Sequence, residues 1–418
     1  MADGDKGSGP GGATSEWRRG WPVVVAAHLG MTLLGIFFFT AGVFFAPLEH
    51  EFHWTRAQVS ISTTIVAIAG MILSAPVGMI LDKWGTRRMA LFGVPLVGIA
   101  FALLSTLNGS IAQFVGLWIA LAILVQFTMV TVWSKAVANN FTRSRGLALS
   151  LAMMGNSVTI IVAPQLANYL IEHQGWRTAY LVLGLGWGGL VTLTTFFMLH
   201  DGRNRPTDDA GVELPQAELT GYTVREGLRS GAFIRLNSAA VICNILNIGF
   251  IVHLVEILTW GGVPRDTAVL IYSSLGLSML VGSFSFGLVG DRLPAKWATA
   301  FTVAGPAVSC ALLLQPGIPV WQGAVAVLFF GFVIGAQMPS FTYTSTLQLG
   351  MRSFGALQGF GNISVSIATA VAPLVAARIF DTTHSYTGYL MIGIPLCLVA
   401  ALILLTLSSK PRFAPAAT

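Results

Sequence analysis

The chain has 418 residues, of which 54% are hydrophobic and only 10% are charged. Soluble domains carry about 25% charged residues, so the composition excludes a soluble globular protein and predicts a polytopic membrane protein. The net charge of +6 is spread along the chain. This spread excludes a nucleic-acid-binding surface and is typical of basic loops on one face of a membrane.

Twelve apolar segments are each long enough to cross a bilayer, because a spanning helix needs about 20 residues. The first six are expected at 21–47, 57–81, 88–107, 111–137, 146–171 and 176–199. The other six are expected at 233–259, 267–290, 297–315, 319–345, 354–379 and 386–407. The sequence therefore predicts an all-α membrane protein with an N-terminal half (21–199) and a C-terminal half (233–407).

Polar segments flank and separate these halves. Residues 1–20 are expected to form a disordered tail, 408–418 a second tail, and 200–232 a linker. Within the linker, Thr223-Val-Arg-Glu226 has the form of a capping box, in which the first and last residues cap a helix start reciprocally. It predicts a short interfacial helix before the seventh span.

A charged motif closes the second span, and a weaker copy closes the eighth. The first reads Gly78-x-x-x-Asp82-x-x-Gly85-x-Arg87-Arg88, and the second carries Gly287, Asp291 and Arg292. Gly287 and Asp291 each lie 209 positions after their counterparts, which is half the chain length, and the same offset relates Gly146 to Gly355. One offset at separate landmarks indicates a duplication, and six spans per half give repeats related by an axis along the membrane normal.

The distribution of basic residues predicts the orientation. Of the 23 Lys and Arg residues, those on the side away from the termini are Arg56, Arg177, Arg265 and Arg378. Because basic loops stay in the cytoplasm, both termini are predicted to be cytoplasmic. The expected location is the cell membrane, as a multi-pass protein, and the inner membrane if the source is bacterial.

The motif at Gly78–Arg88 resembles the signature between the second and third helices of the major facilitator superfamily. Four further segments resemble the monocarboxylate and oxalate transporter branch: Gly42-Val43-Phe44-Phe45, Phe52-x-Trp54-Thr55-Arg56, Phe141-x-x-x-Arg145-Gly146-x-Ala148 and Gly175-Trp176-Arg177. The resemblance implies twelve membrane helices in two six-helix halves, related by a pseudo-two-fold axis along the membrane normal. It also implies a substrate site between the halves.

By the same resemblance, the two motifs latch one half to the other at the cytoplasmic face. Asp82 is then expected to meet the start of the eleventh span near Ser353–Gly355, with Lys135 or Arg145 as an ion partner. Asp291 is expected to meet the start of the fifth span, since carboxylates are favoured at helix N-termini. An ordinary basic turn would explain the arginines but not the spaced Gly and Asp. The latch candidates are Gly78, Asp82, Gly85, Arg87, Arg88, Gly287, Asp291 and Arg292.

Near the middle of the predicted spans the sequence has no Asp, Glu, Lys or Arg, which are costly there and usually functional. The polar side chains that remain include six amides: Gln126, Asn156, Asn244, Asn247, Gln337 and Asn362. Because the first, fourth, seventh and tenth helices of the superfamily line its cavity, the resemblance makes these amides substrate-binding candidates. Each could instead bond a neighbouring helix, although Asn244 and Asn247, three residues apart, favour the cavity.

His28 and His253 are the imidazoles that lie well inside the predicted spans. Histidine titrates nearest physiological pH, so either is a candidate for proton coupling. His253, one helical turn from Glu256, is the better candidate of the two. The alternative for both is a neutral ring that hydrogen-bonds a backbone or side-chain group.

The sequence departs from the resembled branch where that branch binds carboxylates. Its members carry an arginine in the eighth helix, where this chain has Ser283, and some carry a lysine in the first helix, near Phe39 here. Without fixed cations, charge-assisted anchoring is lost, and an arginine introduced at Ser283 is expected to shift preference to small carboxylates. Phe39, Trp133 and Tyr343 favour a larger or aromatic substrate, although aromatic side chains in spans more often serve packing.

These observations predict a secondary transporter that moves an organic monocarboxylate or aromatic acid, alone or by H+ symport. Its expected partners are the small-molecule acid, the lipid bilayer and a proton, and it is expected to act as a monomer without metal or cofactor. Export of a hydrophobic uncharged compound and a transport-dead membrane sensor are the alternatives. An enzyme is not expected, because no nucleophile or His/Asp/Glu cluster gathers at one membrane face.

Overall fold

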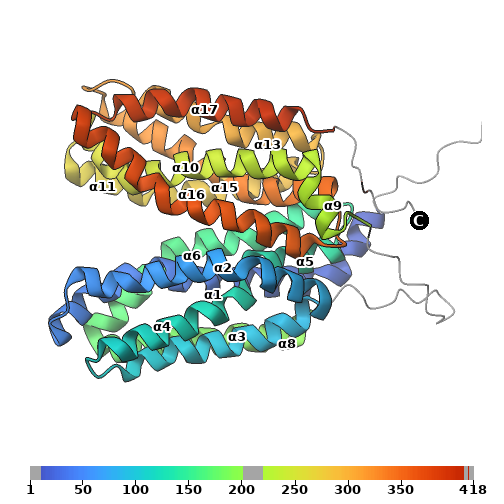
Figure 1. Cartoon of the computed structure of the whole chain (residues 1–418), viewed down its shortest axis with the longest axis horizontal. Helices are drawn as coiled ribbons and strands as arrows, with labels where there is room; N and C mark the ends of the chain where they lie inside the picture. Colours follow the sequence, from blue (N-terminus) through green and yellow to red (C-terminus); the bar gives the residue numbers. More distant parts are fainter. Residues whose placement is uncertain (1–10, 201–219, 409–412, 414–418) are drawn as a thin grey trace, which may run out of the picture.

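The computed structural model describes residues 11–200, 220–408 and 413. Two helical bundles lie side by side (Figure 1). The first contains α1 (Gly11–Phe52), α2 (Arg56–Trp84), α3 (Thr86–Leu103), α4 (Ile111–Val125), α5 (Val130–Asn140), α6 (Arg145–Gln174), α7 (Trp176–Leu181) and α8 (Gly188–Met198). After α9 (Val224–Arg229), the second contains α10 (Gly231–Trp260), α11 (Arg265–Ser273), α12 (Leu275–Val289), α13 (Ala295–Ala304), α14 (Pro306–Leu312), α15 (Val320–Leu349), α16 (Phe354–Thr383) and α17 (Thr387–Leu405).

The predicted all-α, twelve-helix membrane fold is confirmed. In the described part of the chain, 11 helical segments are long and apolar enough to cross a membrane. α13 and α14 occupy the remaining position, between α12 and α15. They are separated at Gly305, because Pro306 begins α14 without a backbone N–H to continue the α13 ladder.

The first helix begins earlier than the sequence predicts. Residues 11–20, expected to belong to a disordered tail, form the start of α1. Two contacts explain the difference: the Glu16 carboxylate accepts hydrogen bonds from the backbone amides of Thr142, Arg143 and Ser144, and Trp17 packs on Phe141. Glu16 thus satisfies amides of the loop that precedes α6.

The fourth span, predicted to be continuous over 111–137, is interrupted near its middle. α4 ends at Val125, a short 3-10 turn covers Gln126–Thr128, and Met129 is extended before α5 begins. The indole of Trp133, a fully buried side chain, donates to the Thr128 carbonyl at 2.8 Å and so satisfies one group freed by the break. Trp133, expected to favour an aromatic substrate, is therefore a buried support of the break in this structure.

The short helix predicted before the seventh span is confirmed as α9. Thr223 and Glu226 form the reciprocal capping box, with each side chain accepting from the other residue's backbone amide. Of the predicted linker, the structure describes residues 200 and 220–232, and the predicted tail at 408–418 lies mostly outside the described residues.

The bundles pack along two helix pairs, α2 with α16 and α12 with α6, which together form the seam. A Cβ added at Gly78 would lie 2.2 Å from the Gly355 carbonyl oxygen, and one at Gly359 would lie 2.3 Å from the Ser74 carbonyl oxygen. Real Cβ atoms essentially never approach a neighbour under 3.0 Å. These positions of the seam therefore require glycine.

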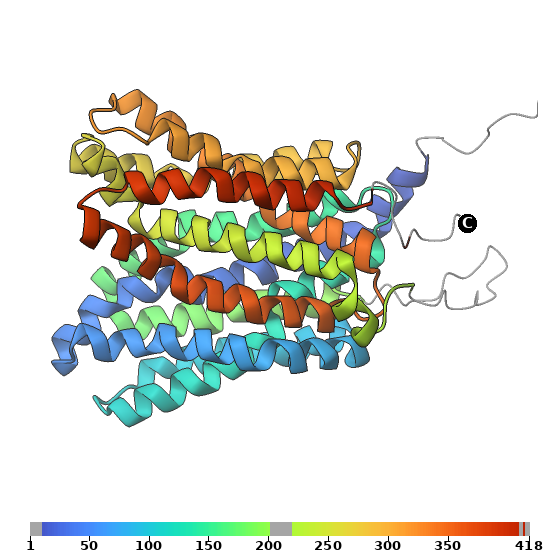
Figure 2. The same ribbon diagram turned by 45° about the horizontal axis from the view of Figure 1, so that its top comes forward.

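The seam lies toward one end of the molecule, beside α9, which we call the latch end. In both views α16 meets α2 at this end and diverges from it toward the opposite end (Figures 1 and 2). The close contacts agree, because they join the first turns of α16, at Gly355 and Gly359, to the last turns of α2, at Gly78 and Ser74. The two bundles are thus joined at one end and apart at the other.

Gly359→Val should separate the bundles at the latch end. The added side chain would overlap the α2 backbone, and overpacking of this kind costs about 1–3 kcal/mol, so the joined arrangement should lose population about tenfold. Distances between spin labels at the exposed positions Lys83 and Arg352 measure the separation. Gly189→Val is the matched control, because a Cβ at Gly189 meets no atom within 4 Å. Equal distance distributions in both variants would contradict the seam model.

Candidate functional site

At the latch end, Asp82 from the end of α2 crosses the seam to the start of α16. Its carboxylate accepts from the backbone amides of Gly355 at 2.9 Å and Ala356 at 2.8 Å. Lys135 of α5 forms an ion pair with the same carboxylate, and its side chain is only 3% exposed. The contacts predicted for Asp82 are therefore present, with Lys135 as the ion partner.

Asp291, which follows α12, makes the corresponding contact with the first bundle. It accepts from the amides of Gly146 at 2.7 Å and Leu147 at 3.2 Å, at the start of α6. Asp82 and Gly146 lie 209 positions before Asp291 and Gly355 respectively. Each half thus supplies one carboxylate and one helix N-terminus, and the two contacts are copies of each other.

A pair of serine contacts extends the same symmetry by two turns. Ser74 donates to the Gly359 carbonyl at 2.9 Å, and Ser283 donates to the Ser150 carbonyl at 3.2 Å. Ser283 is the repeat counterpart of Ser74, and its exposed fraction is 2%. Ser283, predicted as a substrate contact, lies in the seam between α12 and α6 in this structure.

The two carboxylates have different surroundings. Asp82 has the buried ammonium of Lys135, whereas Asp291 lies near the Arg145 guanidinium and accepts from the Tyr343 hydroxyl. Burial raises the pKa of Asp291, against the opposing effect of the amides at the start of α6. The seam therefore holds this carboxylate at a net electrostatic cost. Tyr343, predicted as a substrate contact, belongs to this latch.

The remaining motif residues lie in or next to the turns that follow α2 and α12. Gly85, at φ 84°, makes the turn between α2 and α3 that glycine adopts without strain. Arg87 donates to the Phe196 carbonyl of α8 at 3.1 Å, within the first bundle. Arg88 and Arg292 are exposed.

Next to the seam, toward the middle of the membrane, Gln126 and Asn362 line a small pocket shared by both bundles. The pocket is narrow, and Gly78 and Gly355 of the seam also line it. The Gln126 amide donates to the Ala122 carbonyl at 3.2 Å, while its buried oxygen has no hydrogen-bond partner in the described part of the chain. Irregular backbone at membrane depth occurs where it lines a cavity or is enclosed by protein, so this break marks a candidate binding site.

The other predicted amides lie in the second bundle, except Asn156, which is half-buried on α6. Asn247 donates to the Gln337 side-chain oxygen at 2.8 Å, which joins α10 to α15. Asn244 accepts from Thr369 of α16 at 2.9 Å, so it contacts a different helix from Asn247. Both therefore make interhelical bonds, the alternative that the sequence left open.

The Asn247–Gln337 pair retains unused hydrogen-bonding groups. The Asn247 oxygen and the Gln337 nitrogen are buried without partners among the described residues. Exchanging O and N in both amides would leave one donor and one acceptor again. In either orientation the pair presents one unused donor and one unused acceptor.

The two histidines occupy different environments. His28 of α1 contacts the Leu151 carbonyl of α6 with its Nδ1 atom at 2.8 Å, which fits a ring whose Nδ1–H donates to the backbone. His253 of α10 lies with its Nδ1 atom 3.2 Å from the Tyr386 hydroxyl. Glu256, one turn further along α10, is exposed.

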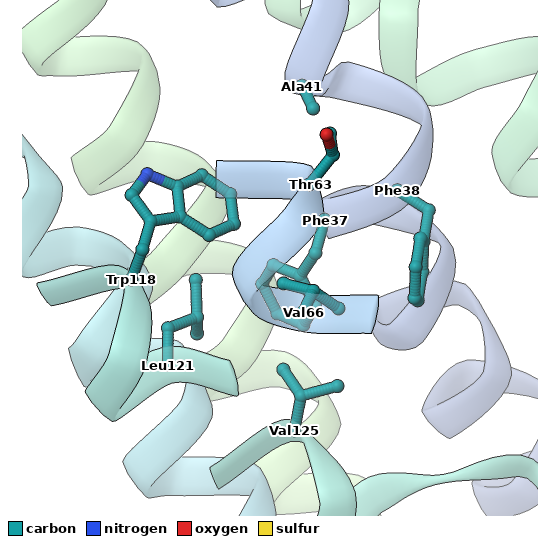
Figure 3. Close-up of a pocket in the computed structure, with 8 residues that line it drawn as sticks. All are labelled: Phe37, Phe38, Ala41, Thr63, Val66, Trp118, Leu121 and Val125. Carbon is teal, nitrogen blue, oxygen red and sulfur yellow. The ribbon is translucent and has the colours of Figure 1, made fainter. Parts of the chain in front are cut away.

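A second pocket lies between α1, α2 and α4 and holds about 420 Å³ of empty space, part of it open to the surroundings. Figure 3 shows Phe38 on one side of it, Trp118 and Leu121 on the other, and Val66 between them. Thr63 contributes the one side-chain hydroxyl of the lining. Phe39, predicted as a substrate contact, is half-buried and is not part of this lining. The sequence marked neither Trp118 nor Val66, because apolar residues in a span carry no distinctive signal.

Two membrane-embedded helical bundles, joined by reciprocal carboxylate contacts and containing a polar site beside a broken helix, define a membrane transporter. The family model described as Major Facilitator Superfamily matches residues 27–373. The chain belongs to this superfamily and is a multi-pass membrane transporter, not an enzyme.

The curated relatives include monocarboxylate transporters. The chain is 27% identical to monocarboxylate transporter 13 of Bos taurus, over 93% of this chain and 89% of that protein. It is 25% identical to human monocarboxylate transporter 12, over 92% of this chain and 80% of that protein. An uncharacterized MFS-type transporter of Bacillus subtilis, YcxA, is 23% identical over 85% of this chain and 86% of that protein. The chain thus resembles the monocarboxylate branch.

Solved structures share the fold. The human organic anion transporter MFSD10 superimposes with a TM-score of 0.70 at 15% identity, covering 92% of this chain and 99% of that one. The Escherichia coli fucose:proton symporter FucP gives a TM-score of 0.72 at 13% identity, covering 92% of this chain and 98% of that one.

Asp82→Asn should lower thermal stability in detergent more than Asp291→Asn. Removing the Asp82 charge leaves the buried Lys135 ammonium without its ion partner, a loss of about 3–5 kcal/mol. In Asp291→Asn, by contrast, the buried Arg145 guanidinium keeps its hydrogen bonds to the Phe141 carbonyl and the Thr346 hydroxyl. Lys135→Met should restore part of the stability in the Asp82→Asn background. Equal losses in the two single variants, or no recovery in the double variant, would contradict this account of the latches.

Proposed function

We propose that the chain is a secondary active transporter that moves organic monocarboxylates, including aromatic acids, by alternating access. The arrangement of the seam carries the proposal: the bundles are joined by paired contacts at one end and diverge at the other (Figure 1). Alternating access requires a state of this kind, in which a midplane site is closed on one side. The names of the monocarboxylate transporter relatives support the substrate class.

The latch end is proposed to face the cytoplasm, together with both termini. The basic residues support this orientation, since 19 of the 23 Lys and Arg residues are predicted from the sequence to lie on the same side as the termini. The state described here would then be open to the outside. The rocking units would be the halves at 21–199 and 233–407, connected by the linker at 200–232.

The acid is proposed to bind with its proton. A carboxylate taken out of water without a cation costs several kcal/mol, and the midplane groups described above are amides. The side-chain amides of Gln126 and Asn362, which line the polar pocket shared by both bundles, can donate to the C=O and accept from the O–H of a protonated carboxyl group. Transport of the protonated acid is H+ symport in which the substrate carries the proton.

Export of a hydrophobic uncharged compound is the second candidate function. The specific observation in its favour is the apolar pocket between α1, α2 and α4, whose lining has no charged side chain. Uptake and efflux assays with matched charged and uncharged compounds separate the two functions.

Reconstituted vesicles should accumulate labelled organic monocarboxylates when the outside is made acidic. Because neutral groups recognise the acid, its primary amide should compete with it within about tenfold of the acid itself. The measurement is uptake of a panel of labelled acids, with and without a pH gradient, against acid and amide competitors. Rejection of every uncharged analogue would contradict the neutral site and require a fixed positive charge in the site.

His253→Gln distinguishes the two routes that the proton can take. If the substrate carries the proton, the variant should still accumulate the acid to about the wild-type level in a pH gradient, because the Tyr386 contact is structural. Counterflow exchange at equal pH is the internal control, since it needs no net proton movement. Loss of accumulation with intact exchange would instead assign the proton to His253.

A further inference from the structure

The pocket between α1, α2 and α4 adjoins the polar pocket at the broken helix. Val125, the last residue of α4, lines the first pocket, and Gln126, the next residue, lines the second. The residues of α2 line the two pockets in the same order. Val66 lines the first pocket, and Ser74, two turns later, lines the second. The two pockets are therefore consecutive along the same two helices.

Their linings differ in chemistry. Around the first pocket, Phe38 and Trp118 face each other across aliphatic side chains (Figure 3), and Thr63 is the one residue with a hydroxyl. Around the second pocket lie the amides of Gln126 and Asn362. The buried Gln126 oxygen has no partner among the described residues, which costs about 1–3 kcal/mol unless a ligand donates to it.

We propose that the pocket between α1, α2 and α4 seats the apolar group of the substrate, with the polar head directed to Gln126 and Asn362. The pocket is partly open to the surroundings, so an aryl or branched alkyl group can pack between Phe38 and Trp118 without being fully enclosed. The pocket would select acids that carry such a group over acids of two or three carbons. The inference rests on the proposed function in one respect, that the ligand is the transported acid.

The test compares phenylacetate, acetate and phenylacetamide as ligands of the purified full-length protein. Binding is measured by calorimetry and by competition for uptake into vesicles. Phenylacetate should bind wild-type protein about tenfold or more tightly than acetate, because its ring is buried. Val66→Trp, which fills the pocket, should remove this advantage and change acetate binding less than about twofold.

Ile68→Trp is the matched control, because Ile68 lies on the same helix, is 46% exposed and does not line the pocket. It should behave as wild type. Thr63→Val, a change of similar volume that removes the one hydroxyl from the lining, should raise the preference for phenylacetate. If Val66→Trp fails to fold, as judged by thermal unfolding, the change in preference caused by Thr63→Val still tests the proposal.

Three results would overturn the proposal. They are equal binding of phenylacetate and acetate in wild type, a preserved preference in folded Val66→Trp, and the same loss in Ile68→Trp. A preserved preference is also the result expected if a lipid chain occupies the pocket. If wild type binds phenylacetamide but neither acid, and Val66→Trp abolishes that binding, the pocket assignment stands and the proposed acid transport fails.

Discussion

The structure depends on satisfying helix N-termini across a boundary between two halves. The first amides of an α-helix have no partner within the helix, and those of α6 and α16 lie at the seam. Asp291 and Asp82 accept from them, and each hydrogen bond to a charged group contributes about 1.5–3 kcal/mol. The joined end of the molecule is therefore held by directional contacts that break as a unit when the helices move apart.

The seam and the polar pocket share walls. Gly78 and Gly355, which allow α2 and α16 to touch, line the same pocket as Gln126 and Asn362. A movement that separates the two glycines therefore changes the distance between the two amides. This shared lining gives a physical route by which the contents of the pocket and the state of the latch influence each other, because neither can change without moving the same helix pair.

The sequence predicted the features that depend on pattern. Apolar length gave the spans, and the 209-residue offset with the spaced Gly and Asp gave the partners of Asp82 and Asp291. It did not predict the break at Gln126, because no Gly or Pro marks it and its stability comes from the Trp133 indole.

The expectation for Ser283 had a different source. That position was assigned by resemblance to another protein's arginine, although the internal repeat pairs it with Ser74. Comparison within the chain would have placed it in the seam. Contacts of side chains with distant backbone, such as Glu16 with the loop that precedes α6, leave no periodic signal and could not be predicted.

The reciprocity of the seam has a consequence for a single half. Each half carries both the group that accepts and the helix start that donates, at equivalent positions, as the two faces of a two-fold symmetric dimer do. Two copies of one half would therefore be complementary to each other at these contacts. In such a pair each substitution at the seam would change both latch contacts at once. In the fused chain, Lys135 acts on the Asp82 contact alone and Tyr343 on the Asp291 contact alone.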